Sequence, residues 1–339
     1  MKIRRLVAGS ALAALLMGSS ALADTLDRVR DRGHLTCGVK AGLAGFAAQD
    51  VNNEWQGFDV AYCRALAAAV LGDPQAVTFR AITPDSRYAM LASGDIDVLV
   101  RDATWTFINE VDFGVFYVGV TYFDGQGVLM PRDLGASSLF ELEAPTVCVE
   151  AGSTAERTLA EIGQREDFVF ETFPVASRAE AQQQYLSGGC DVYAAALSDL
   201  AATRASFADP EAHAVISEGA AKDPRGLVVR RGDDGWAQIV RWVHFALVAA
   251  EELGITSANI GELAENSRSA EITRILGQSD GFGPILGLDE DWALRAISAS
   301  GNYGEIFASN IGEGTPIGLP RGLNALWTQG GLVYAPPFR

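Results

Sequence analysis

Short apolar runs alternate with segments of helical spacing through the first third of the chain. Leu35–Val39 is a short apolar run, and Phe58–Val70 repeats apolar residues at helical spacing until the glycine and proline of Leu71–Pro74 end it. Three further elements follow in the order strand, helix, strand: Val77–Ile82, Asp85–Ala92 and Ile96–Val100. This alternation predicts a parallel sheet covered by helices.

The same order begins again after Tyr122. The predicted elements are a strand, a helix capped by Ser153, a strand, a helix and a strand: Thr146–Val149, Thr154–Ile162, Phe168–Phe173, Ser177–Leu186 and Asp191–Ala195. The chain therefore contains two similar α/β units.

The two units also share a local motif. Ser93–Val98 and Ser187–Val192 both fit S-G-x-x-D-V, each at a predicted turn from helix to strand. Glycine ends the helix there with a positive φ, and the aspartate opens a buried strand. Ligands gather at the carboxyl ends of the strands in open parallel sheets, so we expect a cleft between the units that closes by a hinge motion.

The last third of the chain is mainly helical in pattern. Gly235–Gly254 keeps an apolar stripe at helical spacing, and further helices are predicted from Ser257, from Glu271 and from Asp289. The tail, Gly322–Arg339, holds aromatic residues and prolines, and we expect it to wrap the first unit.

The N-terminus has the pattern of a secretory signal peptide. A charged start is followed by the apolar stretch Leu6–Met17 and by the small-residue site Ala21–Ala23, so we assign residues 1–23 to the signal. The apolar stretch is too short to span a bilayer, which argues against a membrane anchor. The remaining 316 residues favour two domains, and they contain no apolar run that approaches the roughly 20 residues of a membrane span.

The charge balance restricts the partners. Without the three basic residues of the signal, 23 basic residues stand against 43 acidic ones, a net charge of −20. Such a surface repels phosphate backbones and anionic membranes. The net charge therefore argues against binding to nucleic acids or to lipid surfaces. Solubility outside the cytoplasm accounts for the charge.

Four cysteines in an exported chain form an even set in an oxidising compartment. Three connectivities are open, and we favour Cys37 with Cys63 and Cys148 with Cys190 because each pair then lies within one predicted domain. Four buried free thiols are the alternative. A metal site is a weaker interpretation, because the spacings are far from C-x-x-C and the chain has only three histidines.

Ten segments across the chain carry a resemblance to one known family: Cys37–Val39, Gly57–Val60, Cys63–Ala65, Gly94–Leu99, Thr104–Thr106, Gly119–Gly127, Cys190–Tyr193, Glu251–Asn259, Gly301–Phe307 and Arg321–Trp327. They resemble segments of the general L-amino-acid-binding periplasmic proteins of polar amino-acid ABC importers, which are family 3 solute-binding proteins. The last three are specific to the extended C-terminus of this family.

The resemblance implies an α/β fold of the two-lobed periplasmic-binding-protein kind (type II), with a helical C-terminal extension. Lobe 1 would comprise residues 24–128 and 228–339, and lobe 2 residues 129–227, with crossing strands near Val128–Met130 and near Leu227–Arg230. It further implies a periplasmic monomer that binds a small polar solute, has no cofactor and delivers the solute to a membrane-embedded ABC permease.

Two positions depart from the family pattern. Relatives place an arginine for the ligand carboxylate five residues after the threonine that opens Thr-x-Thr, where this chain has Asn109. They place an aspartate for the ammonium five residues after the motif aspartate, where this chain has Ala196. Losing both charge-assisted hydrogen bonds weakens binding by roughly 100-fold to 10,000-fold. We therefore hypothesise that the ligand is not an ordinary α-amino acid, or that amino acids bind weakly.

Other ligand-binding candidates follow predicted strands. Hydroxyl side chains suit an anion or a carbonyl, and the candidates of this kind are Ser153, Thr154 and Thr104. The charged candidates are Lys40, Arg101 and Asp102, and Phe46 could form an apolar wall of the site. Ser153 and Thr154 also fit an ordinary helix N-cap, and Arg101 also fits a structural ion pair. Asp199 could replace the missing anion only if the loop that carries it follows a different path from the one that the resemblance implies.

Two other function classes stay open. A few members of this fold act as periplasmic dehydratases with an acid in the cleft, for which Asp102 is the candidate, but no nucleophile or base motif accompanies it. The second class is an interaction or sensory receptor that has lost its transport ligand. We expect a binding protein without enzymatic activity.

Overall fold

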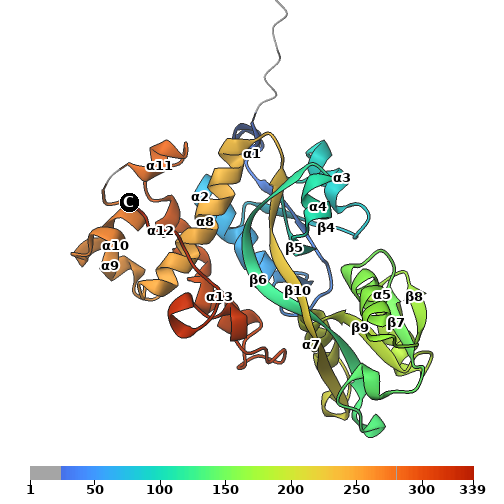
Figure 1. Cartoon of the computed structure of the whole chain (residues 1–339). Coiled ribbons are helices and arrows are strands. Elements are labelled where there is room, and N and C mark those ends of the chain that lie inside the picture. Colours follow the sequence, from blue (N-terminus) through green and yellow to red (C-terminus); the bar gives the residue numbers. More distant parts are fainter. Residues whose placement is uncertain (1–23, 280) are drawn as a thin grey trace, which may run out of the picture.

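A mixed sheet of eight strands runs through the molecule in the computed structural model, which describes residues 24–279 and 281–339 apart from the side chains of 101, 102 and 218–221. The strand order within these residues is β4-β1-β5-β10-β6-β9-β7-β8. The long antiparallel strands β6 (Val115–Pro131) and β10 (His213–Arg230) form its middle and pass from one half of the molecule to the other (Figure 1). The predicted signal peptide lies outside the described residues.

The first unit has the predicted parallel strands and helices. Strand β1 (Leu35–Val39) lies between β4 (Val77–Ala81) and β5 (Val98–Thr104), parallel to both. Helix α2 (Phe58–Leu71) follows β1, and α3 (Arg87–Ser93) follows β4. The order is as predicted, and the helix and strand boundaries differ by a few residues.

The second unit repeats this arrangement. Strands β7 (Thr146–Glu150), β8 (Glu171–Val175) and β9 (Val192–Ala196) are parallel, with β7 in the centre. The connecting helices are α5 (Thr154–Glu166), α6 (Arg178–Leu186) and α7 (Leu197–Ala205). The Ser153 side chain caps α5 as predicted, accepting a hydrogen bond from the backbone of Glu156 at 3.1 Å.

One strand of the second unit begins later than predicted. The apolar alternation placed it at Phe168–Phe173, but β8 spans Glu171–Val175. Phe168 and Phe170 pack together, 5.9 Å between ring centres, against a core cluster of this unit. The alternation therefore marks a loop that enters the core before the edge strand begins.

The remaining elements are mostly helices of the last third, and they pack on the first unit. Helix α8 (Asp234–Glu252) shares one hydrophobic core with α2, and the tail returns to it, with the Trp242 and Phe338 rings 5.0 Å apart. None of the helices in the described part of the chain could cross a membrane. The other elements are α1 (Thr25–Arg32), β2 (Ala48–Gln49), β3 (Trp55–Gln56), α4 (Phe107–Val111), α9 (Ile260–Asn266), α10 (Ala270–Ile275), α11 (Phe282–Ile285), α12 (Trp292–Ser300) and α13 (Tyr303–Asn310).

The shared motif makes the same contact in both units. The Asp97 carboxylate accepts a hydrogen bond from the backbone of Thr36 at 2.7 Å, and the Asp191 carboxylate accepts one from Thr146 at 2.7 Å. The motif glycine has a φ of 80° in the first unit and 75° in the second. The motif therefore ties the end of a helix to the central strand of each unit.

Each unit also contains one disulfide, in the connectivity that the sequence favoured. Cys37 on β1 is bonded to Cys63 on α2, with 6.2 Å between Cα atoms. Cys148 on β7 is bonded to Cys190 just before β9, with 5.7 Å between Cα atoms. Both bonds join the central strand of a unit to an adjacent segment.

Each half has hydrophobic cores, and Ala201 and Ala202 of α7 pack in the core of the first unit. The residues predicted near the crossings lie on β6 and β10, where Val128 packs in a core of the second unit and Leu227 in the core of the first. The pairing of β6 with β10 is irregular between Ser217 and Lys222. The lobe boundaries themselves stay a prediction.

Candidate ligand-binding site

A polar cavity lies where the carboxyl ends of the strands of both units face each other. It is small and has room for only a few water molecules. Loops of the first unit, the two long strands and the second unit all line it: Lys40, Pro84, Arg87, Thr104, Gln126, Glu150, Ser153, Thr154, Ala155, Tyr193, Ala194, Ala195, Ala196, Asp199, Asp223 and Arg225.

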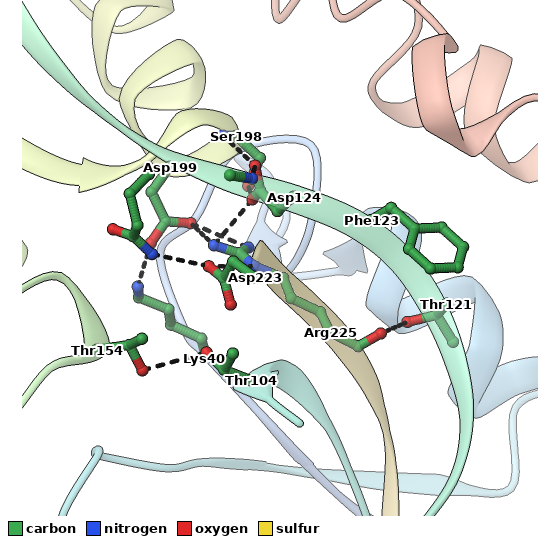
Figure 2. Close-up of polar contacts among 12 residues, drawn as sticks. Lys40, Thr104, Thr121, Phe123, Asp124, Thr154, Ser198, Asp199, Asp223 and Arg225 are labelled. Atoms are coloured by element: carbon green, nitrogen blue, oxygen red, sulfur yellow. Dashed lines mark hydrogen bonds and ion pairs between the residues drawn. The ribbon is translucent and has the colours of Figure 1, made fainter. Parts of the chain in front are cut away.

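Two direct contacts cross this cavity between the units. The Lys40 ammonium, after β1, pairs with the Asp199 carboxylate on α7 at 2.7 Å. The Thr104 hydroxyl, at the end of β5, lies 3.2 Å from the Thr154 hydroxyl in the first turn of α5. Both contacts are visible in Figure 2. Charged and hydroxyl groups from the two units therefore meet within hydrogen-bonding distance.

The buried guanidinium of Arg225 on β10 holds a cluster of three carboxylates behind this contact. It lies 3.1 Å from Asp124, 3.3 Å from Asp199 and 3.7 Å from Asp223 (Figure 2). Burial raises the pKa of Asp124, and Arg225 together with a hydrogen bond from Ser198 opposes that rise. Asp199 therefore lies between two cations, Lys40 and Arg225.

Two other cavity-lining groups have buried polar atoms without a hydrogen-bond partner in the described part of the chain. One is the Nε–H of Arg87, whose guanidinium lies 4.7 Å from the centre of the Tyr88 ring. The other is Oε1 of Gln126, whose amide nitrogen donates to Asp223 at 3.1 Å. One atom is a donor and the other an acceptor.

The two positions that depart from the family pattern differ in their surroundings. Asn109 on α4 is 3% exposed and does not line the cavity; its amide donates to the backbone carbonyl of Thr104 at 2.9 Å. Tyr117 donates to the same carbonyl at 2.8 Å. Ala196 does line the cavity, as the N-cap residue of α7, and brings no charge to it.

The structure brings together four of the other predicted residues, Lys40, Thr104, Ser153 and Thr154, at the cavity. Phe46 lies elsewhere, in the aromatic core, with its ring 5.8 Å from that of Tyr122. Arg101 and Asp102 lie on β5, and their side chains are outside the described ones. Among residues 24–279 and 281–339, no three His, Cys, Asp or Glu side chains are arranged to hold a metal ion.

Among the residues at the cavity that were not predicted to bind ligand are Arg87, Gln126, Asp223 and Arg225. Asp199 was given only a conditional role. Arg87 follows β4, and Asp199 lies in the first turn after β9, so both stand at carboxyl ends of parallel strands. That rule could have identified them. Asp223 and Arg225 belong to a strand that crosses between the units, and no local motif marks them.

Two α/β units, two long crossing strands and a charged cavity between the units define a two-lobed binding protein. Residues 35–257 match the family of bacterial extracellular solute-binding proteins, family 3, and the chain belongs to this family. It is 50% identical over 331 residues to the glutamate/glutamine/aspartate/asparagine-binding protein BztA of Rhodobacter capsulatus, covering 98% of each chain. It is 42% identical to the general L-amino acid-binding periplasmic protein AapJ of Rhizobium johnstonii, over the full length of both.

A solved structure has the same fold over most of the chain. It is an ABC transporter periplasmic binding protein from Brucella ovis with glutathione bound. It superimposes with a TM-score of 0.91 and 42% identity, covering 94% of this chain and all of that one. The fold predicted from the sequence is therefore confirmed.

Proposed function

We infer that this chain is the periplasmic substrate-binding component of an amino-acid-type ABC importer, and that its lobes close on a small polar solute. The observation that carries this inference is the ion pair between Lys40 and Asp199, which brings opposite charges from the two units into one cavity. A cavity that admits only a few water molecules is too small for an amino acid. Entry of a solute therefore requires the units to separate.

The hinge in this proposal lies in the two long strands. Residues 24–128 and 228–339 form lobe 1, and residues 129–227 form lobe 2, except that the boundary residues Val128 and Leu227 each pack in the core of the opposite lobe. The irregular pairing of β6 with β10 near Lys222 supports bending there, because an interrupted ladder has fewer hydrogen bonds to break. The protein acts as a monomer and delivers its solute to a membrane-embedded permease.

The ligand in this proposal carries both a carboxylate and an N–H group but is not held as an ordinary α-amino acid. The relatives named above are described as binding glutamate, glutamine, aspartate, asparagine or, in the solved structure, glutathione. Here positions 109 and 196 offer no charge, so recognition falls to Lys40, Asp199 and the threonine pair instead. Because the charged side chains stand at other positions than in the family pattern, we expect the ligand to bind in a different orientation.

Calorimetric titration tests the proposal with five solutes: L-glutamate, L-glutamine, L-aspartate, L-asparagine and glutathione. We expect at least one of the five to bind, and the four amino acids to bind at least 100-fold more weakly to this chain than to BztA measured in parallel. Equal affinity of the two proteins for the same amino acid would contradict the changed ligand geometry. Release of a product from any solute, followed by mass spectrometry, would contradict a purely binding role.

A further inference from the structure

Arg87 occupies an unusual position for a buried arginine. Its side chain lines the cavity and is 9% exposed, yet its Nε–H has no hydrogen-bond partner among the described residues. A buried donor left unpaired destabilises a folded protein, and such groups are rare. Arg87 therefore calls for a partner beyond the described residues, and a bound ligand is such a partner.

The surroundings hold Arg87 in one place. Its guanidinium lies over the Tyr88 ring, and the Tyr88 hydroxyl is 2.9 Å from that of Tyr117. Tyr117 in turn donates to the backbone carbonyl of Thr104, a residue of the cavity wall. A guanidinium mounted in this way loses little conformational entropy when it binds an anion.

Gln126 provides the complementary group. Its Oε1 is buried at the same cavity without a partner, while its Nε2 is fixed by Asp223. Among the described residues, Arg87 thus brings to the cavity an unpaired donor on a cation, and Gln126 brings an unpaired acceptor. A carboxylate satisfies the first, and an ammonium or amide N–H satisfies the second.

We propose that Arg87 is the residue that binds a carboxylate of the ligand, and that Gln126 accepts a hydrogen bond from a ligand N–H group. Arg87 then takes the role that relatives give to an arginine at position 109, where Asn109 instead supports Thr104. The cation then comes from the first residue of α3 rather than from α4, so the ligand carboxylate is bound from a different direction. This inference rests on the proposed function, because it assumes a ligand in this cavity.

Glu150, at the end of β7, lines the same cavity and is the competing partner for Arg87. If Arg87 served to pair with Glu150 on closure, removing either side chain would weaken binding equally. If Arg87 binds the ligand carboxylate, Glu150→Gln removes a like charge from the anion site. We therefore expect Glu150→Gln to leave ligand affinity unchanged or to strengthen it.

Calorimetry with L-glutamate and glutathione separates these cases. We expect Arg87→Met to weaken whichever of the two solutes binds by about 10-fold to 100-fold, the value of one charge-assisted hydrogen bond. Arg80→Met, which removes an exposed arginine from β4, is the matched control and should change affinity less than twofold. Unchanged affinity of a folded Arg87→Met protein, or equal loss in Arg87→Met and Glu150→Gln, overturns the proposal.

A second measurement follows the wild-type protein and uses a variant only to assign one resonance. The Arg87 Nε–H resonance, assigned by its absence in Arg87→Lys, is followed in the wild-type protein during titration with L-glutamate, glutathione and sodium acetate. We expect at least one of these carboxylates to shift it with saturation, and a resonance that none of them moves overturns the proposal. A shift with acetate when neither of the other solutes binds would support Arg87 as a carboxylate site and contradict the proposed ligand class.

Discussion

The first unit and the second unit each pair a tyrosine with a histidine, but at different depths. The Tyr62 hydroxyl lies 3.0 Å from Nδ1 of His244 in the fully buried core beneath α8. The Tyr185 hydroxyl lies 2.7 Å from Nδ1 of His213 in a partly buried position of the second unit. Burial raises the free-energy cost of protonating an imidazole, so the same contact makes protonation more costly at His244 than at His213.

The motif aspartates also lie at different depths in the two units. Asp97 is 3% exposed and pairs with Arg32, whereas Asp191 is exposed and makes the same backbone contact at the surface. The helical last third covers the first unit, and in the second unit the disulfide supplements smaller cores. We infer that the first unit is the more rigid of the two and that the second unit moves relative to it.

The largest expected effect concerns the histidines. Burial lowers the pKa of His244 from 6.5 to about 4, so the unfolded chain binds a proton that the folded chain does not between these pH values. Stability from this group is complete above about pH 6.5 and falls by about 3 kcal/mol as the pH drops toward 4. Urea unfolding at pH 7, 6 and 5 measures this decline, and His244→Gln should remove it.

His213 is the control for the second unit. Burial lowers its pKa too, while Asp209 and Asp133 oppose the change, so His213→Gln should alter the pH dependence less than His244→Gln does. A larger change from His213→Gln would reverse the comparison between the units.

A smaller effect is expected at the motif aspartates. Asp97→Ala leaves the buried Thr36 N–H without an acceptor and should lower the free energy of unfolding by about 2 to 3 kcal/mol. Asp191→Ala frees a backbone group that water can reach, and should cost about 1 kcal/mol. Chemical denaturation of both variants measures the difference. Equal losses of unfolding free energy would contradict a difference in burial between the two motif aspartates.

Local patterns were enough to predict most of the fold. Periodicity predicted a helix at Phe58–Val70, which the structure has as Phe58–Leu71, and the strand Leu35–Val39, because each buries one consistent set of side chains. It misplaced β8, because apolar alternation records contact with the core, and the partly buried Phe168 and Phe170 pack against the core from a loop. Local pattern does not separate an edge strand from the loop that precedes it.

The candidate site was predicted only in part. Lys40, Thr104, Ser153 and Thr154 follow strands, so their place at the cavity could be read from the order of elements. The partners of Arg225 could not, because Asp124, Asp199 and Asp223 meet only when the two long strands pair and α7 packs beside them.

The most direct test of the central claim is the affinity of Asp199→Asn for the solute that binds the wild-type protein most tightly among the five. Asp199 contributes the second unit's charge to the contact with Lys40, so we predict affinity at least 10-fold weaker than that of the wild-type protein. Asp209→Asn, an exposed change on the same unit, should bind within twofold of the wild-type protein. A folded Asp199→Asn protein with wild-type affinity would contradict the account that charges from both units bind the solute.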